Sequence, residues 1–146
     1  LRVIKGENMR LIISTLFALG LSQTAMAADT PSVAGASVYI IAPKNGETIS
    51  GPVHVLFGLK GMGVAPAGSD AEGTGHHHLV LDAPTPPLNA YLPMGDAHVI
   101  HFGKGQTETE LNLPTGQHTL QLVLGDRDHK PHSPPLVSER ITITVK

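Results

Sequence analysis

Short apolar segments separated by turn residues recur along this chain about every ten residues, a spacing typical of antiparallel β-proteins. Apolar and polar residues alternate within the segments, and Gly, Pro, Asn and Asp gather between them. The segments comprise residues 37–43, 47–61, 76–83, 97–102, 106–113, 117–124 and 138–146. None of these segments, nor the sequence between them, shows helical periodicity of useful length. The pattern predicts an all-β fold, an immunoglobulin-like antiparallel β-sandwich of about seven strands, with a small β-barrel as the alternative.

Alternate residues along four of these segments are apolar, which marks the face that each strand turns towards the core. His54 falls on the opposite, outer face of its strand. The predicted core positions are Val53, Val55, Phe57, Leu59, Leu79, Leu81, Leu120, Leu122, Leu124, Ile141, Ile143 and Val145.

The first residues of the chain have the composition of a secretory signal. Basic residues precede an apolar run over 11–21, and Ala25-Met26-Ala27 has the small-x-small form of a signal-peptidase site. The apolar run is shorter than the roughly 20 residues that a membrane-spanning helix needs. We therefore expect residues 1–27 to comprise a cleaved signal peptide and upstream residues, with Met9 as the start. This predicts a periplasmic or secreted protein without a stable membrane anchor after cleavage.

The remaining chain is long enough for one modest hydrophobic core and too short to divide into several domains. Residues 28–36 are small and polar, which predicts a flexible lead-in. Residues 37–146 are expected to form a single β-sandwich domain.

Composition argues against several kinds of site. The chain has no Cys, so a metal site in it cannot use thiolate. The formal net charge of -2 and the scattered Lys and Arg residues argue against a nucleic-acid surface. Aromatic residues make up 3% of the chain and Trp is absent, which removes the usual stacking platforms for sugars and single-stranded nucleic acid. No phosphate-binding loop, HExxH or nucleophile-elbow motif occurs.

Nine histidines stand out in so small a chain, and three of them are consecutive. On a regular strand His76 and His78 share one face, which we expect to be the outer one. His77 then lies on the side of Leu79 and Leu81, at the rim of the core. Two imidazoles at i and i+2 can bind one ion from the same side, so His76 and His78 are candidate ligands and His77 is a weaker candidate. The alternative is three solvated histidines at a loop end.

Two further histidines lie in a proline-rich segment, residues 125–135. His129 and His132 are three residues apart, and the neighbouring prolines fix φ, which reduces the entropy lost when side chains are positioned for a ligand. Asp126 and Asp128 could orient an imidazole by accepting its other N–H, or they could be turn residues. The alternative for the whole segment is an ordinary turn with two exposed histidines.

The other histidines lie in predicted strands, with His98 and His101 in the same one and His54 and His118 alone in theirs. His101 lies near the end of its strand, beside the Gly-rich turn at 103–105, so we prefer it as a ligand to His98. We interpret His98 as a capping or surface residue. His54 and His118 are interpreted as structural or exposed histidines.

Neutral imidazoles without thiolate suit copper(II), zinc or nickel, and the order of affinities favours copper. We expect a copper carrier, buffer or metallochaperone rather than a catalyst, with the metal ion as its partner and a periplasmic protein as a second candidate partner. Residues 61–75, rich in Gly, Ala and Pro, are expected to form a structureless flap over the site. Nitrogens that bind one ion should lie within about 3 to 4 Å of one another. The predicted ligand pool is His76, His78, His101, His129 and His132.

Two other functions fit the same residues. A non-catalytic interaction module could dock a protein or cell-envelope partner, with its histidines serving structure or pH response. A metal-dependent oxidase or hydrolase would need an open coordination position. Because a ligand of the native state raises the melting temperature, a stability change with copper or zinc distinguishes a metal carrier from an interaction module.

Four motifs in order along the chain resemble a known family. They are GLKGMGVAPAG, GHHHLVLD, HFGKGQTETEL and GQHTLQLVLGDRDHKPHSPPLVSERITI. Together they are similar to the domain of unknown function family 4399, small exported bacterial proteins, over residues 39–146. The resemblance implies a β-sandwich and marks the positions of His76, His77, His78, His101, His129 and His132. It also marks Gly61, Gly63, Pro66, Gly68 and Gln106, which implies that the flap and the strand after His101 shape the site.

Overall fold

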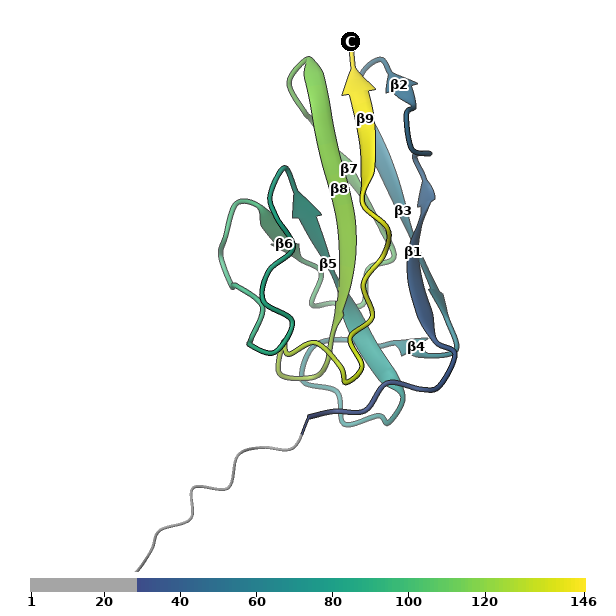
Figure 1. Ribbon diagram of the computed structural model, residues 1–146, viewed down its shortest axis with the longest axis vertical. Coiled ribbons are helices and arrows are strands. Elements are labelled where there is room, and N and C mark those ends of the chain that lie inside the picture. The colour runs from purple at the N-terminus through teal and green to yellow at the C-terminus, as the bar shows by residue number, and fades with distance from the viewer. Residues whose placement is uncertain (1–28) are drawn as a thin grey trace, which may run out of the picture.

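The computed structural model describes residues 29–146, and every regular element in that range is a β-strand (Figure 1). The predicted signal peptide over residues 1–27, with its start at Met9, lies outside the described residues. The described part of the chain contains no helix that is long and apolar enough to cross a membrane.

The first sheet contains three antiparallel strands in the order β1-β3-β7. These strands are β1 (Ser37–Ala42), β3 (Val53–Lys60) and β7 (Glu108–Leu111). The sequence alternation is realised along β3, where Val53 and Val55 are fully buried and His54 between them is exposed. The inner face of this sheet therefore supplies one half of the core.

The second sheet has the order β2-β9-β8-β5-β4, with β6 paired to β5 beside this path. Its central strands, β8 and β5, are antiparallel and place Gly125 opposite His76 and Val123 opposite His78. The strands are β2 (Thr48–Ile49), β4 (Gly63–Val64), β5 (Thr74–Leu81), β6 (Val99–His101), β8 (Gly116–Gly125) and β9 (Ile141–Val145).

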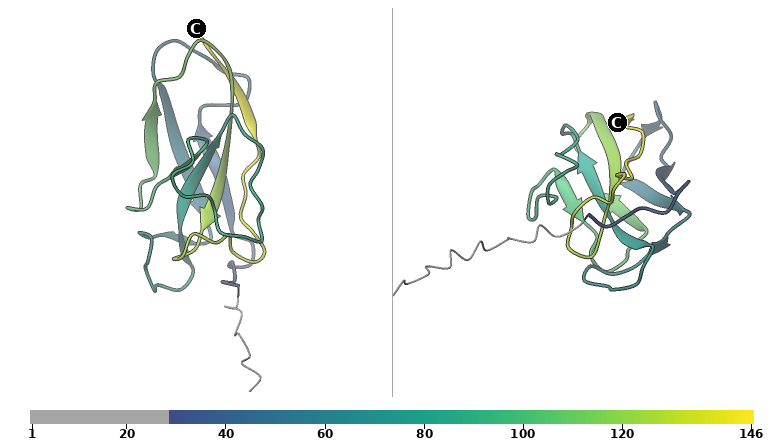
Figure 2. Two further views of the ribbon diagram at one scale, coloured as in Figure 1. Left: turned by 90° about the vertical axis from the view of Figure 1, so that its left-hand side faces the viewer. Right: turned by 60° about the horizontal axis from the view of Figure 1, so that its bottom comes forward.

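The strands of three or more residues divide as in an immunoglobulin-like sandwich. In chain order they are β1, β3, β5, β6, β7, β8 and β9; the first, second and fifth form one sheet, and the others form the second. Immunoglobulin-type domains likewise set strands A, B and E against C, F and G. Figure 2 shows the two layers from further directions. The predicted β-sandwich is confirmed, and the alternative barrel is excluded because the two sheets stay separate.

The main core fills the space between the two sheets. Leu120, Leu122 and Leu124 of β8 are fully buried there, and each such side chain contributes about 1.5–3 kcal/mol relative to an exposed one. The core positions predicted from alternation are buried or partly buried, so the assigned parity is confirmed. The fully or largely buried members include Val53, Val55, Phe57, Leu79, Leu120, Leu122, Leu124, Ile141, Ile143 and Val145.

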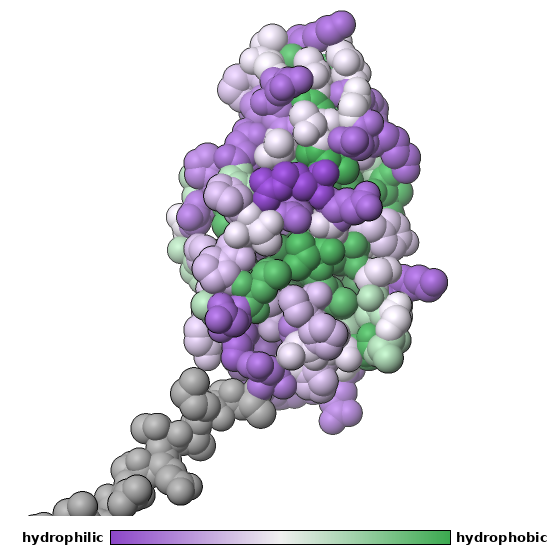
Figure 3. All heavy atoms as spheres, in the orientation of Figure 1, coloured by the Kyte–Doolittle hydropathy of each residue, from purple (hydrophilic) through white to green (hydrophobic). Residues whose placement is uncertain are grey.

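The other face of the second sheet is also covered, by the connection between β5 and β6 at residues 82–98. Val80 and Val123 on that face pack with Leu92 of the connection, and these three residues form a smaller apolar cluster. Figure 3 shows that apolar side chains gather in a band across one face of the molecule, with polar side chains on either side. The expectation of a solvent-facing outer side for β5 is therefore wrong, because a proline-rich connection folds over it.

Residues 61–75 are more regular than the structureless flap that we predicted. β4 pairs in parallel with the start of β5, and the amide of Ala65 donates to the carbonyl of Gly75 at 2.9 Å. Further along, the amide of Ala67 donates to Gly103 at 2.9 Å and that of Gly68 donates to Arg127 at 2.8 Å. The segment therefore connects the residues that follow His101 with those that precede His129.

Candidate metal centre

Strand β5 presents two imidazoles on its covered face. His76 and His78 are two residues apart, so both point away from the main core, and their ring centroids are 4.7 Å apart. Both residues are fully buried. The alternation of the strand thus produces the pair of neighbouring rings that the sequence predicts.

Two more histidines reach this pair from other segments of the chain. His101 on β6 pairs with His78 in the sheet, and its ring centroid lies 5.1 Å from that of His78 and 5.0 Å from that of His76. His129 enters from the β8–β9 connection, with its ring centroid 5.0 Å from that of His76 and 4.7 Å from that of His101. His76, His78, His101 and His129 are called the four-histidine cluster below.

Three of the four cluster histidines place a ring nitrogen close enough to form a candidate metal group, whereas the ring centroid of His129 lies 6.0 Å from that of His78. One ring nitrogen from each of His76, His78 and His101 lies within 4.8 Å of the others, and Nε2 of His129 is 3.2 Å from Nε2 of His101. Imidazole nitrogens about 2.0–2.1 Å from a metal ion lie about 3 to 4 Å apart. Separations of up to 4.8 Å exceed this range, so one ion bound by the triad would draw the three rings closer together.

The buried rings of the cluster lack hydrogen-bond partners. Among the described residues, neither ring nitrogen of His76 or of His78 has a partner within the protein, although both side chains are inaccessible to solvent. Leaving a buried polar group unpaired costs about 1–3 kcal/mol. Such groups are rare in native proteins, and unsatisfied imidazole nitrogens that converge on one point are the arrangement that a metal ion would complete.

Burial keeps these imidazoles neutral. Burial, with smaller contributions from His129 and His101, lowers the pKa of His76 to about 4. Burial and the neighbouring cluster rings lower the pKa of His78 to about 3. The pKa of His101 is also lowered, by burial first and by His129 second. Because metal binding requires neutral imidazole, these rings are in the binding form at pH 7 without losing a proton.

The loop that carries His129 is closed by Asp126. One carboxylate oxygen of Asp126 accepts the backbone N–H groups of Asp128 and Lys130, both at 2.9 Å, and the carbonyl of Asp126 accepts the N–H of His129 at 3.1 Å. The backbone of His129 has φ of 70°, the left-handed region that residues other than Gly seldom adopt. Asp126 is thus a turn residue that shapes the loop and does not bind an imidazole directly.

Two glycines leave the space that the cluster rings occupy. A Cβ at Gly103 would lie 2.2 Å from the His101 ring, and a Cβ at Gly125 would lie 2.7 Å from the His78 ring. Neither glycine was selected as a site residue from the sequence. The available signal was position, since Gly103 begins the turn two residues beyond His101 and Gly125 ends the strand opposite His76.

His132 lies outside the cluster although it belongs to the predicted ligand pool. It is 1% exposed, and its Nε2 is 3.2 Å from the carbonyl oxygen of Thr74. A Cβ at Gly75 would point at the His132 ring and at Leu124, so His132 lies on the core side of β5. The structure therefore brings together His76, His78, His101 and His129 and places His132 behind the strand.

His77 is a core residue rather than a residue at the rim of the core. It is fully buried on the face opposite the cluster, with its ring centroid 5.1 Å from that of Phe57. Burial lowers its pKa to about 4, and a smaller effect of the Gln106 backbone acts in the opposite direction.

The remaining histidines lie apart from the cluster and have local partners. Nδ1 of His98 donates to the carbonyl of Leu81 at 2.9 Å, and exposed His54 pairs with Glu108 at 3.3 Å. His118 contacts the Asp82 carboxylate through one nitrogen and the Pro114 carbonyl through the other. These contacts are those of surface and structural residues.

The family model described as "Domain of unknown function (DUF4399)" matches residues 55–146, well over half of the chain. This chain belongs to that family. The match confirms the resemblance drawn from the four motifs, and all histidines of the cluster fall within the matched range.

Other comparisons add little to the family assignment. No curated protein matches the chain. A solved structure described as fibronectin(III)-like modules of Clostridium thermocellum CbhA is similar at 18% sequence identity, with a TM-score of 0.44, over 75% of this chain and 95% of that one.

Proposed function

We propose that this member of the family binds one copper ion through the four-histidine cluster and acts as a copper carrier, buffer or metallochaperone. The observation that supports the proposal most directly is the convergence of four imidazoles, two of which are fully buried with all their ring nitrogens unpaired. A metal ion would supply the partner that these nitrogens lack. His118, outside the cluster, has an acceptor for each ring nitrogen, whereas the core residue His77 is unpaired like His76 and His78.

The donor set favours copper(II), with zinc or nickel as competitors. All four donors are imidazoles, and the described residues around them include no carboxylate in the group that could share one ion. Imidazole suits zinc, copper and nickel, and copper(II) binds most tightly of the three to a given site of this kind. Neutral rings with lowered pKa values favour binding at neutral and mildly acidic pH.

The signal-like N-terminus supports a place of action outside the cytoplasm. A basic region, an apolar run over 11–21 and a small-x-small site precede the described domain. The proposed carrier therefore works in the periplasm or is secreted, and it exchanges copper with a protein of the same compartment. A domain without Cys avoids thiol oxidation in such a setting.

Copper titration of untagged protein tests the proposal, because an affinity tag would itself bind metal. We expect one copper(II) per chain after dialysis, and replacing His78 and His101 together by Ala should remove it. The matched control replaces His54 and His98 by Ala, which removes the same number of histidines outside the cluster. Equal copper content in the two double variants would refute the site.

The melting temperature distinguishes the proposal from an interaction module. Copper at a hundred times its dissociation constant should add about 2.7 kcal/mol to the free energy of unfolding, because it binds the native state alone. An interaction module with structural histidines predicts no change with copper or zinc. The His54/His98 control should keep the full increase, and the His78/His101 variant should lose it.

A further inference from the structure

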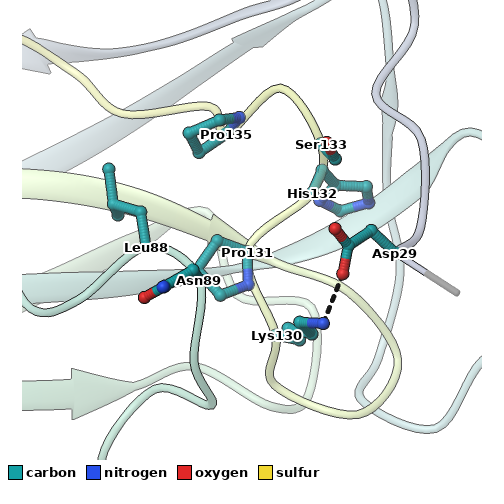
Figure 4. Close-up of a pocket in the computed structure, with 8 residues that line it drawn as sticks. All are labelled: Asp29, Leu88, Asn89, Lys130, Pro131, His132, Ser133 and Pro135. Atoms are coloured by element: carbon teal, nitrogen blue, oxygen red, sulfur yellow. Dashed lines mark hydrogen bonds and ion pairs between the residues drawn. The ribbon is translucent and has the colours of Figure 1, made fainter. Parts of the chain in front are cut away.

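The first described residues of the chain lie against the loop that carries His129. The amide of Ser133 donates to the carbonyl of Thr30 at 2.9 Å, and the amide of Ser32 donates to the carbonyl of Ser133 at 3.1 Å. The Asp29 carboxylate pairs with the Lys130 ammonium, and Figure 4 shows this ion pair between the two segments. Residues 29–32, called the N-terminal strap below, are thus attached to the site loop rather than running free as the predicted lead-in.

One buried carboxylate connects the strap to the loop. Asp126 is 4% exposed, and its Oδ2 accepts a hydrogen bond from the Thr30 hydroxyl at 2.7 Å. Its Oδ1 accepts the N–H groups of Asp128 and Lys130, the bonds that close the loop around His129. Hydrogen bonds to an ionised group are stronger than those between neutral groups. The strap therefore restrains the carboxylate on one side while the loop depends on it on the other.

His129 needs this restraint more than the other cluster members do. His76, His78 and His101 are fixed by strand pairing, whereas His129 projects from a loop and holds a left-handed backbone conformation. That conformation costs about 1–2 kcal/mol for a residue with a side chain, so it persists only where neighbouring bonds impose it. Most of the bonds that impose it here involve Asp126, and the amide of Leu92 adds one to the His129 carbonyl at 2.8 Å.

We propose that the N-terminal strap is a positioning element of the metal site, and that Thr30 acts through Asp126 to hold His129 as the fourth ligand. This inference rests on the proposed metal site. Without the Thr30 hydroxyl the Asp126 carboxylate can turn, the loop can relax and His129 can leave the cluster. Copper would then be held by the three strand histidines alone. The first residues of the domain, far from His129 in sequence, would thereby set the affinity of the site.

The test compares the Thr30→Val variant with the wild-type protein, both purified from the cell after natural processing. The substitution keeps the shape of the side chain and removes the hydroxyl. We expect the copper(II) dissociation constant to rise about tenfold, as for loss of one hydrogen bond to a charged group. The nitrogen hyperfine pattern in electron paramagnetic resonance should change to that of His129→Ala. Thr30→Ser retains a hydroxyl, so its copper(II) dissociation constant and its nitrogen hyperfine pattern should be those of the wild type.

Thr144→Val is the matched control, since Thr144 lies on β9 and is partly buried like Thr30. It should leave the copper spectrum unchanged even if the melting temperature falls. A merely structural Thr30 would lower the melting temperature of Thr30→Val without changing the spectrum of bound copper, and that result would overturn the inference while leaving the metal site intact. Wild-type protein that binds no copper would overturn both.

Discussion

The histidines near the two ends of strand β8 differ in their hydrogen-bond partners. Near its start, His118 places each ring nitrogen against an acceptor, the Asp82 carboxylate at 2.7 Å and the Pro114 carbonyl at 2.8 Å. At its other end, roughly 20 Å away along the strand, β8 lies beside His76 and His78, whose nitrogens have no partner. His118 has a partner for each ring nitrogen, and the rings of His76 and His78 have none.

The contrast concerns His118 and the two cluster histidines, which are all buried but differ in their hydrogen-bond partners. Two acceptors require both ring nitrogens of His118 to carry a proton, and the Asp82 hydrogen bond first and the Pro114 carbonyl second raise its pKa. Burial first, and the neighbouring rings second, lower the pKa values of His76 and His78. Opposite pKa shifts in one small domain thus follow from burial without an acceptor at His76 and His78 and from hydrogen bonding to a carboxylate at His118.

Replacing one histidine of each kind should give opposite results, and this is the largest effect expected. His78→Leu should weaken copper binding by at least about a hundredfold and leave the metal-free domain as stable as the wild type or more so, because an unpaired polar ring is exchanged for an apolar side chain. His118→Leu should leave copper binding unchanged and lower the stability by about 1–3 kcal/mol, because Oδ2 of Asp82 and the Pro114 carbonyl each lose a hydrogen-bond donor. Calorimetric titration and urea unfolding measure the two quantities, and a large loss of stability in His78→Leu would contradict the comparison.

The metal-free domain should lose stability on the acid side. The folded pKa of His77 is about 4, below its ordinary value of 6.5, so the unfolded chain takes up protons first as the pH falls. His77 therefore contributes fully above about pH 6.5, and on the order of 2–3 kcal/mol is lost as the pH falls towards 4. Urea unfolding of wild type and His77→Leu at pH 7 and pH 4.5 measures this, and equal acid losses in the two proteins would count against it.

The cluster should depend on the free space beside its rings, just as His118 depends on its hydrogen bonds. A methyl group at Gly103 would lie 2.2 Å from the His101 ring, which must then swing away. Gly103→Ala should weaken copper binding about tenfold with little effect on folding, since His101 is partly exposed and its ring is free to move. Gly95→Ala is a useful contrast because nothing lies within 4 Å of a Cβ there, although its φ of 74° adds backbone strain. Only the Gly103 variant should change the copper affinity.

The smallest expected effect is the loss of the stability that His118 contributes as the pH rises. Its folded pKa is raised, so its stabilisation is complete below pH 6.5 and disappears as the pH rises through the folded value. Asp82→Asn keeps the size of the side chain and the tolerated backbone at φ of 51°, and removes the charge. The variant should be less stable than the wild type at pH 6 by about 1 kcal/mol and nearly equal to it at pH 9. A difference that is the same at both values would show that proton binding is not involved.

The sequence predicted the fold and half of the cluster for the same physical reason. Alternation along a strand is local, so the parity of Leu120 to Leu124 and the shared face of His76 and His78 could be read directly. Position at a strand end favoured His101, which the structure pairs with His78. Alternation cannot show what covers a strand, and the burial of this face by residues 82–98 was therefore missed.

The sequence by itself determined which side of β5 each imidazole takes, because side-chain direction on a strand depends on residue number alone. Only the tertiary structure decided which loop histidine joins them. His129 and His132 share one proline-rich loop, and the sequence offers no reason to separate them. The left-handed turn at His129, closed by Asp126 and restrained from Thr30, sends one ring to the cluster and the other behind the strand. Such a choice depends on bonds between distant segments, which no local pattern contains.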